Sequence, residues 1–117
     1  MTCSEAQDEA AWAWTKEFLA RLEPKHIMGL AVGNDLDAYQ FQAGVSAACL
    51  RALWDEGGLW RRFGRIVSDF DALGFGTVPV TSAFTAGALQ GQGTNFAEVP
   101  GKARVNSFLL NATGVYG

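Results

Sequence analysis

The sequence lacks the features that would place the protein on nucleic acid or in a membrane. Its 117 residues carry nine basic and twelve acidic side chains, a formal net charge of −3. A basic surface for a phosphate backbone is therefore not expected. No run of about 18 apolar residues occurs, and the first residues have neither the basic nor the apolar region of a signal peptide. We expect no nucleic-acid partner and no membrane span.

Residues that hold metals and cofactors are also scarce. His26 is the only histidine, and its place between a helix end and a strand favours a solvent-facing or capping role. Cys3 and Cys49 do not have the spacing of metal ligands. The two could form one disulfide, but the helical pattern around Cys49 favours a small core residue there and a free Cys3. The glycine-rich stretch 87–93 lacks the ending of a phosphate loop. We expect no metal and no cofactor.

The residues that are present predict one globular domain or part of one. Hydrophobic residues make up 49% of the chain, which excludes a disordered segment. Ser4 and Gln7 form a capping-box pattern. A helix is predicted after them, ended near Pro24, with one apolar face at a spacing of three to four residues: Ala11, Trp14, Phe18 and Leu22. The four tryptophans lie on helical patterns and are expected to pack in the core.

Two short apolar runs predict strands, at residues 27–32 and 78–84. Runs without alternation are typical of parallel strands covered on both faces. Helical patterns at 46–54, which Ser46 can cap, and at 59–73 separate them. Another follows the loop 85–101, with Asn111 and Thr113 on its exposed side. The order helix, strand, helix pair, strand, helix indicates an α/β fold with a parallel sheet. The outer edges of a sheet of only two strands are unpaired. These edges indicate that the chain is part of a larger protein, and they predict self-association.

The stretch "GLAVGNDLDAYQ", residues 29–40, runs from an apolar strand straight into polar residues. Asn34 and Asp35 follow Gly33 directly. Ligands of parallel α/β proteins bind beyond the carboxyl ends of the strands, so both residues are candidates for a site. Both also form turns readily, and a purely structural turn is the alternative.

Three stretches together resemble the middle of family 17 of the glycoside hydrolases, the β-1,3-glucanases: "IMGLAVGNDLD", "ALGFGTVPVTSAFTAGAL" and "FLLNATGVYG". The resemblance implies that the whole chain is one segment of a (β/α)₈ TIM barrel. It also implies a β-glucan polysaccharide or oligosaccharide as the partner, hydrolysis of its glycosidic bonds, and an extracellular or cell-wall location.

The resemblance also assigns residues. Asn34 matches the family's sugar-contacting Asn, and Asp35 stands where the family has its general acid/base Glu. The family's nucleophile lies on a strand beyond residue 117, so we expect the chain alone to be inactive. By their position, further candidates for substrate binding lie at or just past the ends of the two predicted strands: Asp37, Tyr39, Thr81, Ser82 and Phe84.

Other interpretations remain open. The chain could be a non-catalytic or degenerate carbohydrate-binding module, or an unrelated small α/β interaction domain in which the Gly-Asn-Asp turn is structural. The basic run of Arg61, Arg62 and Arg65 is expected to form a solvated helix face. The aromatic candidates Tyr39 and Phe84 could stack on sugars or simply pack.

Overall fold

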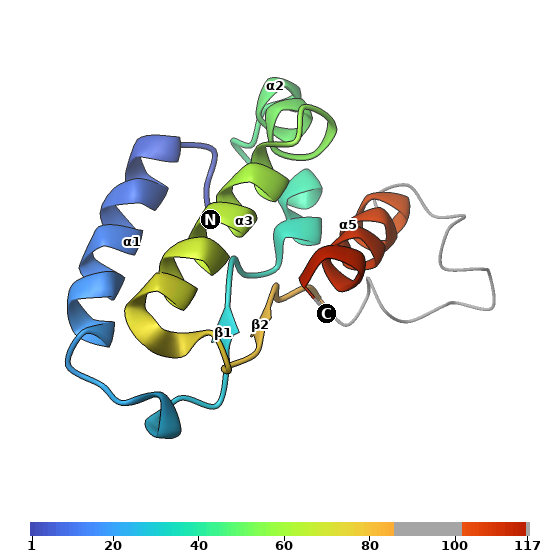
Figure 1. The fold of residues 1–117 in the computed structure, drawn as a ribbon. Helices are drawn as coiled ribbons and strands as arrows, with labels where there is room; N and C mark the ends of the chain where they lie inside the picture. Colours follow the sequence, from blue (N-terminus) through green and yellow to red (C-terminus); the bar gives the residue numbers. More distant parts are fainter. Residues whose placement is uncertain (86–101, 117) are drawn as a thin grey trace.

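A computed structural model describes residues 1–85 and 102–116, which form helices on a short two-stranded sheet (Figure 1). The main elements are α1 (Glu5–Leu19), β1 (Leu30–Ala31), α2 (Ala47–Leu50), α3 (Gly58–Phe70), β2 (Val80–Thr81) and α5 (Lys102–Tyr116). Two 3₁₀ turns, Pro24–His26 and Leu36–Phe41, and two π-helical segments, Arg51–Asp55 and Asp71–Phe75, complete them. The order agrees with the predicted one. The predicted long loop lies outside the described residues except for Thr85.

The two strands pair in parallel, as predicted. Leu30 lies opposite Val80 and Ala31 opposite Thr81. The Leu30 amide donates to the Pro79 carbonyl at 2.9 Å. Each strand is only two residues long, shorter than the apolar run that predicted it. Parallel pairing brings the carboxyl ends of both strands to one edge. Whether this sheet belongs to a (β/α)₈ barrel stays a prediction.

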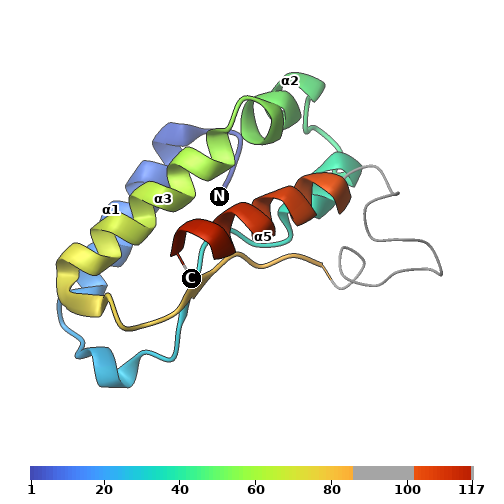
Figure 2. The same ribbon diagram turned by 45° about the vertical axis from the view of Figure 1, so that its right-hand side comes forward.

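The sheet is covered on one face by the described residues, and not on both as predicted. Leu30 and Val80 are half-buried and pack against both apolar clusters beneath the helices. Ala31 and Thr81 alternate to the opposite face and are exposed. Figures 1 and 2 show α3 between α1 and α5, above the strands. We call the surface around Ala31 and Thr81 the open sheet face. Self-association through this face or the strand edges stays a prediction.

The first helix begins as predicted but buries a different face. The Ser4 hydroxyl accepts a hydrogen bond from the Gln7 amide and caps α1. Trp12 and Leu19 are buried, whereas Trp14 and Phe18, predicted to face the core, are 70% and 54% exposed. The helix also ends before the predicted stop, at Leu19.

The central helix α3 carries the core. Its buried residues include Leu59, Phe63, Val67 and Phe70, the apolar pattern that predicted the helix. Phe63 meets Phe108 of α5 edge-to-face, with ring centroids 5.1 Å apart. The T-shaped geometry is the favoured one for aromatic pairs. The core therefore joins α3 to α5 through edge-on and tilted rings.

The cysteines are neither free nor separate: Cys3 and Cys49 form a disulfide, with Cα atoms 5.6 Å apart. The separation of 46 residues gave no local pattern that could indicate the pairing. The bond attaches the segment before α1 to α2.

Two further predictions are confirmed. His26 is exposed to solvent, and Ser46 caps α2 by accepting a hydrogen bond from the Cys49 amide.

Charged side chains join α1 to α3. Arg62 was predicted to be solvated, but its side chain is only 12% exposed and binds Asp8 at 2.7 Å. Arg65 pairs with Glu9. Asp69 accepts from the Trp12 indole at 2.7 Å and from Lys16 at 3.0 Å. Arg62 and Arg65 therefore hold two helices together, whereas Arg61 is exposed as predicted.

The Asp69 contacts predict a stability change in acid. Hydrogen bonds from Trp12 and then Lys16 hold the pKa of the Asp69 carboxyl below its ordinary value. A group with a lowered folded pKa contributes stability above its unfolded pKa of about 3.9 and loses it as pH falls through the folded pKa. We expect Asp69→Asn to lower the urea midpoint at pH 7 and to lose less stability than wild type between about pH 4 and pH 2.

Trp12→Phe is the companion variant, since it keeps the ring and removes the indole donor to Asp69. Its acid loss should fall between those of the wild type and Asp69→Asn. The measurement is the urea midpoint of the wild type and both variants across this pH range. Equal acid losses in all three proteins would show that the Asp69 contacts do not couple protonation to folding.

Candidate functional site

The chain turns sharply where it leaves β1. Val32 is buried, and Gly33 follows with φ 81°. A β-carbon at Gly33 would lie 2.7 Å from Leu36 Cδ1, so only glycine fits there without moving the buried Leu36. Asp35 is also left-handed, with φ 47°, a conformation that Asp and Asn tolerate better than most residues. The sequence Gly-Asn-Asp therefore matches the local backbone.

This turn presents Asn34 and Asp35 at the carboxyl edge of the sheet. Asn34 is exposed and Asp35 is half-buried. The Asn34 Nδ2 donates to Asp35 Oδ2 at 2.9 Å, so the amide fixes the orientation of the carboxylate beside it. The side chain of Asp35 makes no capping bond to the following 3₁₀ turn. The carboxylate is thus held by a side-chain amide and open to solvent.

Asp37 joins the two strand ends. Its Oδ1 accepts from the Thr85 amide at 2.9 Å, and its Oδ2 accepts from the Thr85 hydroxyl. Thr85 lies just beyond β2 and was not among the predicted site residues. A single threonine in a glycine-rich stretch carries no pattern that would have indicated this contact. Asp37 therefore ties the turn after β1 to the segment after β2.

The other predicted residues lie around the same edge with different surroundings. Ser82 is buried and donates to the Val32 carbonyl at 2.7 Å. Tyr39 donates its hydroxyl to the Met1 carbonyl. Phe84 packs against Trp54 and Phe108, with centroids 6.4 and 5.8 Å away. Thr81 is exposed on the open sheet face. In this arrangement Asn34 and Thr81 are exposed, and Asp35, Asp37, Tyr39 and Phe84 are half-buried.

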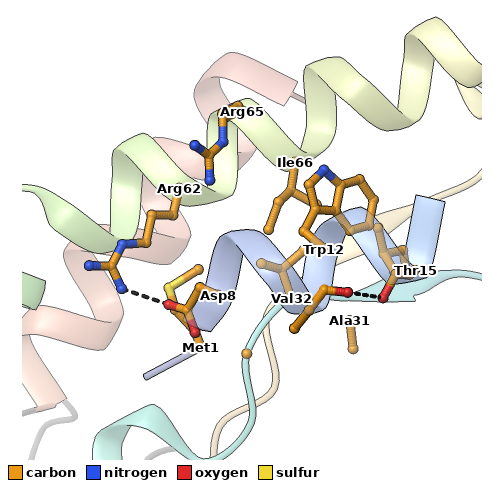
Figure 3. A pocket seen from close by; sticks show the side chains of 12 residues that line it. Met1, Asp8, Trp12, Thr15, Ala31, Val32, Arg62, Arg65 and Ile66 are labelled. Atoms are coloured by element: carbon orange, nitrogen blue, oxygen red, sulfur yellow. Dashed lines mark hydrogen bonds and ion pairs between the residues drawn. The ribbon is translucent and has the colours of Figure 1, made fainter. Parts of the chain in front are cut away.

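A pocket of about 230 Å³ lies between α1, α3 and β1, and reaches Val32 and Gly33 at the start of the turn (Figure 3). Trp12 and Ile66 form its apolar wall, and Asp8, Arg62 and Arg65 contribute charged groups. Sequence reasoning missed it, because the arginines were expected on a solvated face. Their burial depends on acidic partners of α1 that are distant in sequence.

The chemistry available at the edge follows from these contacts. Asp35 can exchange a proton with a bound group, and Asn34 can donate or accept hydrogen bonds. A retaining glycosidase needs a second carboxyl about 5–5.5 Å from the first. The neighbouring Asp37 has both oxygens bonded to Thr85. Within residues 1–85 and 102–116, no group of three acidic, histidine or cysteine side chains could hold a metal ion.

Two general findings complete the description. None of the helices in the described part of the chain is both long and apolar enough to cross a lipid bilayer. Comparison with protein-family models, with curated proteins and with solved structures gave no match for this chain.

Proposed function

We propose that this chain is a segment of a β-glucan-active glycoside hydrolase, with Asp35 as general acid/base and Asn34 as a sugar-binding amide. The observation that carries the proposal is the Asn34–Asp35 hydrogen bond at the carboxyl edge of two parallel strands. Parallel α/β proteins bind their ligands at this edge. The glucan preference itself comes from the resemblance to family 17.

The open sheet face supports a larger parent fold. Parallel strands are normally covered on both faces, whereas Ala31 and Thr81 are exposed here. In a barrel, one face of each strand meets helices and the other meets the interior of the barrel. The described strands have their helices on one side only, as a barrel segment would.

The disulfide supports an extracellular location. Disulfides persist in oxidising compartments and are rare in the cytosol. The Cys3–Cys49 bond therefore favours a secreted parent, which is where an enzyme acting on cell-wall glucan would work.

A non-catalytic role for the chain itself is the second candidate. It is favoured by the contacts of Asp37, whose two oxygens are bonded to Thr85, which leaves Asp35 as the open carboxylate of this turn. One carboxyl cannot act as both acid and nucleophile in a retaining reaction. Both candidates predict that the chain alone binds glucan without hydrolysing it. They differ in whether the full-length parent hydrolyses glucan.

The test is binding of a soluble β-1,3-glucan, measured by calorimetry. We expect the chain to bind weakly and to release no reducing sugar. Asn34→Ala should weaken binding by about tenfold, because a hydrogen bond to the sugar is lost and the Asp35 carboxylate loses its orienting partner. Gln7→Ala, an exposed amide on α1, is the control and should bind as wild type does. Equal binding by Asn34→Ala and the control would refute a sugar site at this turn.

A further inference from the structure

The first three residues form a strap that crosses several elements; we call Met1–Cys3 the N-terminal strap. The Thr2 amide donates to both carboxylate oxygens of Asp8, at 2.7 and 3.0 Å. The Thr2 carbonyl accepts from Arg62 at 2.8 Å. The Met1 carbonyl accepts from the Tyr39 hydroxyl. The strap therefore contacts α1, α3 and the turn after β1.

The strap covers a buried charge pair. Met1 packs against the core cluster and lines the pocket between α1, α3 and β1. In Figure 3 the Met1 side chain lies beside Asp8, which is bonded to Arg62. The side chains of Asp8 and Arg62 are only 10% and 12% exposed. The Arg62 Nε is buried and has no hydrogen-bond partner among the described residues.

A disulfide cross-links the strap to α2. Cys3, within the strap, is bonded to Cys49 of α2. Cys3 is exposed and Cys49 is half-buried, so a small thiol can reach the bond. Exposed disulfides are typically the labile and regulatory ones. The remaining attachments are hydrogen bonds and the partly buried Met1 side chain, whose modest net contribution competes with the conformational entropy that these residues gain on release.

We propose that the N-terminal strap is a redox-controlled lid on this pocket, opened by a dithiol reductant. A thiolate of the dithiol attacks one sulfur of the Cys3–Cys49 bond, and the second thiol completes the exchange. The protein gains two electrons and two protons and becomes two thiols, while the dithiol becomes a disulfide. The strap then leaves, and water reaches Asp8 and Arg62.

The two helices beneath also have contacts with each other that do not involve the strap. Leu19 and Phe70 share a buried cluster that joins α1 to α3. Lys16 pairs with Asp69, and Arg65 pairs with Glu9. The strap takes part in none of these contacts, so its release leaves the two helices packed. This inference is independent of the proposed glucan activity.

The test compares hydrogen exchange by NMR in the oxidised chain and in the chain reduced with dithiothreitol. We expect the Thr2 amide and the Arg62 Nε–H to exchange at least about tenfold faster after reduction. The amides of Phe63 and Val67 in α3 should exchange at unchanged rates. The double variant Cys3→Ser/Cys49→Ser, without reductant, should reproduce the reduced state, and dithiothreitol should have no further effect on it.

Two results would overturn the proposal. Unchanged exchange of Thr2 and Arg62 after complete reduction would mean that noncovalent contacts hold the strap. Equal acceleration in α3 would mean that the disulfide stabilises the whole domain and not a lid. Free-thiol titration with a chromogenic disulfide confirms complete reduction in each sample.

Discussion

Asp35→Asn in the full-length parent is expected to abolish release of reducing sugar from a soluble β-1,3-glucan, with turnover lower by at least about 10²-fold. The asparagine keeps the size of the side chain and tolerates the left-handed backbone of Asp35, which has φ 47°. The change removes the carboxyl group, with its charge and its exchangeable proton. The loss would therefore reflect chemistry and not a change in the turn.

Asp35→Glu tests the same acid/base role by keeping the carboxyl group and changing its reach. The glutamate is the residue type that the proposed relation to family 17 expects at this position, and it lengthens the reach of the carboxyl. We expect activity to be kept or raised, although a left-handed glutamate is strained. Asp71→Asn, an exposed carboxylate after α3, is the matched control and should have wild-type activity. If Asp35→Asn keeps the turnover of the wild type, the turn has a structural role only. If the wild-type parent itself is inactive, the non-catalytic candidate is favoured.

Phe63→Ala is expected to cost about 3–5 kcal/mol of folding free energy, a large part of the 5–15 kcal/mol typical of a small domain. Phe63 is 2% exposed, and its ring contacts Phe108, Trp60 and Tyr116 at centroid distances of 5.1, 6.4 and 5.7 Å. Removing the ring leaves a cavity where α3 meets α5. The variant should be largely unfolded or have a sharply lower urea midpoint.

Phe41→Ala is the matched control for this change. It removes the same ring from a position that is 82% exposed, where substitutions usually change stability by less than about 0.5 kcal/mol. Urea denaturation followed by circular dichroism compares the two variants with wild type. Similar midpoints for both variants would contradict the central place of Phe63 in the core.

Local signals in the sequence were sufficient for the elements and their order. Ser4 and Ser46 cap helices where the capping patterns placed them. The apolar runs predicted both strands and their parallel pairing. Their length was overestimated, because apolar residues continue past the hydrogen-bonded pairs into buried connections such as Val78.

Long-range choices could not be predicted in the same way. Apolar residues lie on two faces of α1. The face with Trp14 and Phe18 is as apolar as the face with Trp12, so the sequence pattern does not show which face is buried. The choice is decided by Asp69, which accepts from the Trp12 indole across 57 residues. Arg62 was likewise assigned to solvent, because its partner Asp8 lies 54 residues away.

The candidate site likewise has local features that the sequence predicts and long-range contacts that it does not. The Gly-Asn-Asp turn and its place at the strand edge follow from local sequence. The partner of Asp37 is Thr85, 48 residues later, and Ser82 bonds to Val32 across 50 residues. Such contacts depend on the register of two strands, and composition and spacing do not specify a register.

The Cys3–Cys49 bond also has a mechanical consequence. When the chain is pulled from its two ends, force passes through the bridge, and the 46-residue separation that it spans cannot extend. At about 3.5 Å per extended residue, the oxidised chain is shorter than the reduced chain by roughly 160 Å at full extension. The helix α1 and strand β1 lie within this shielded loop, whereas α3, β2 and α5 lie in the part that bears the load.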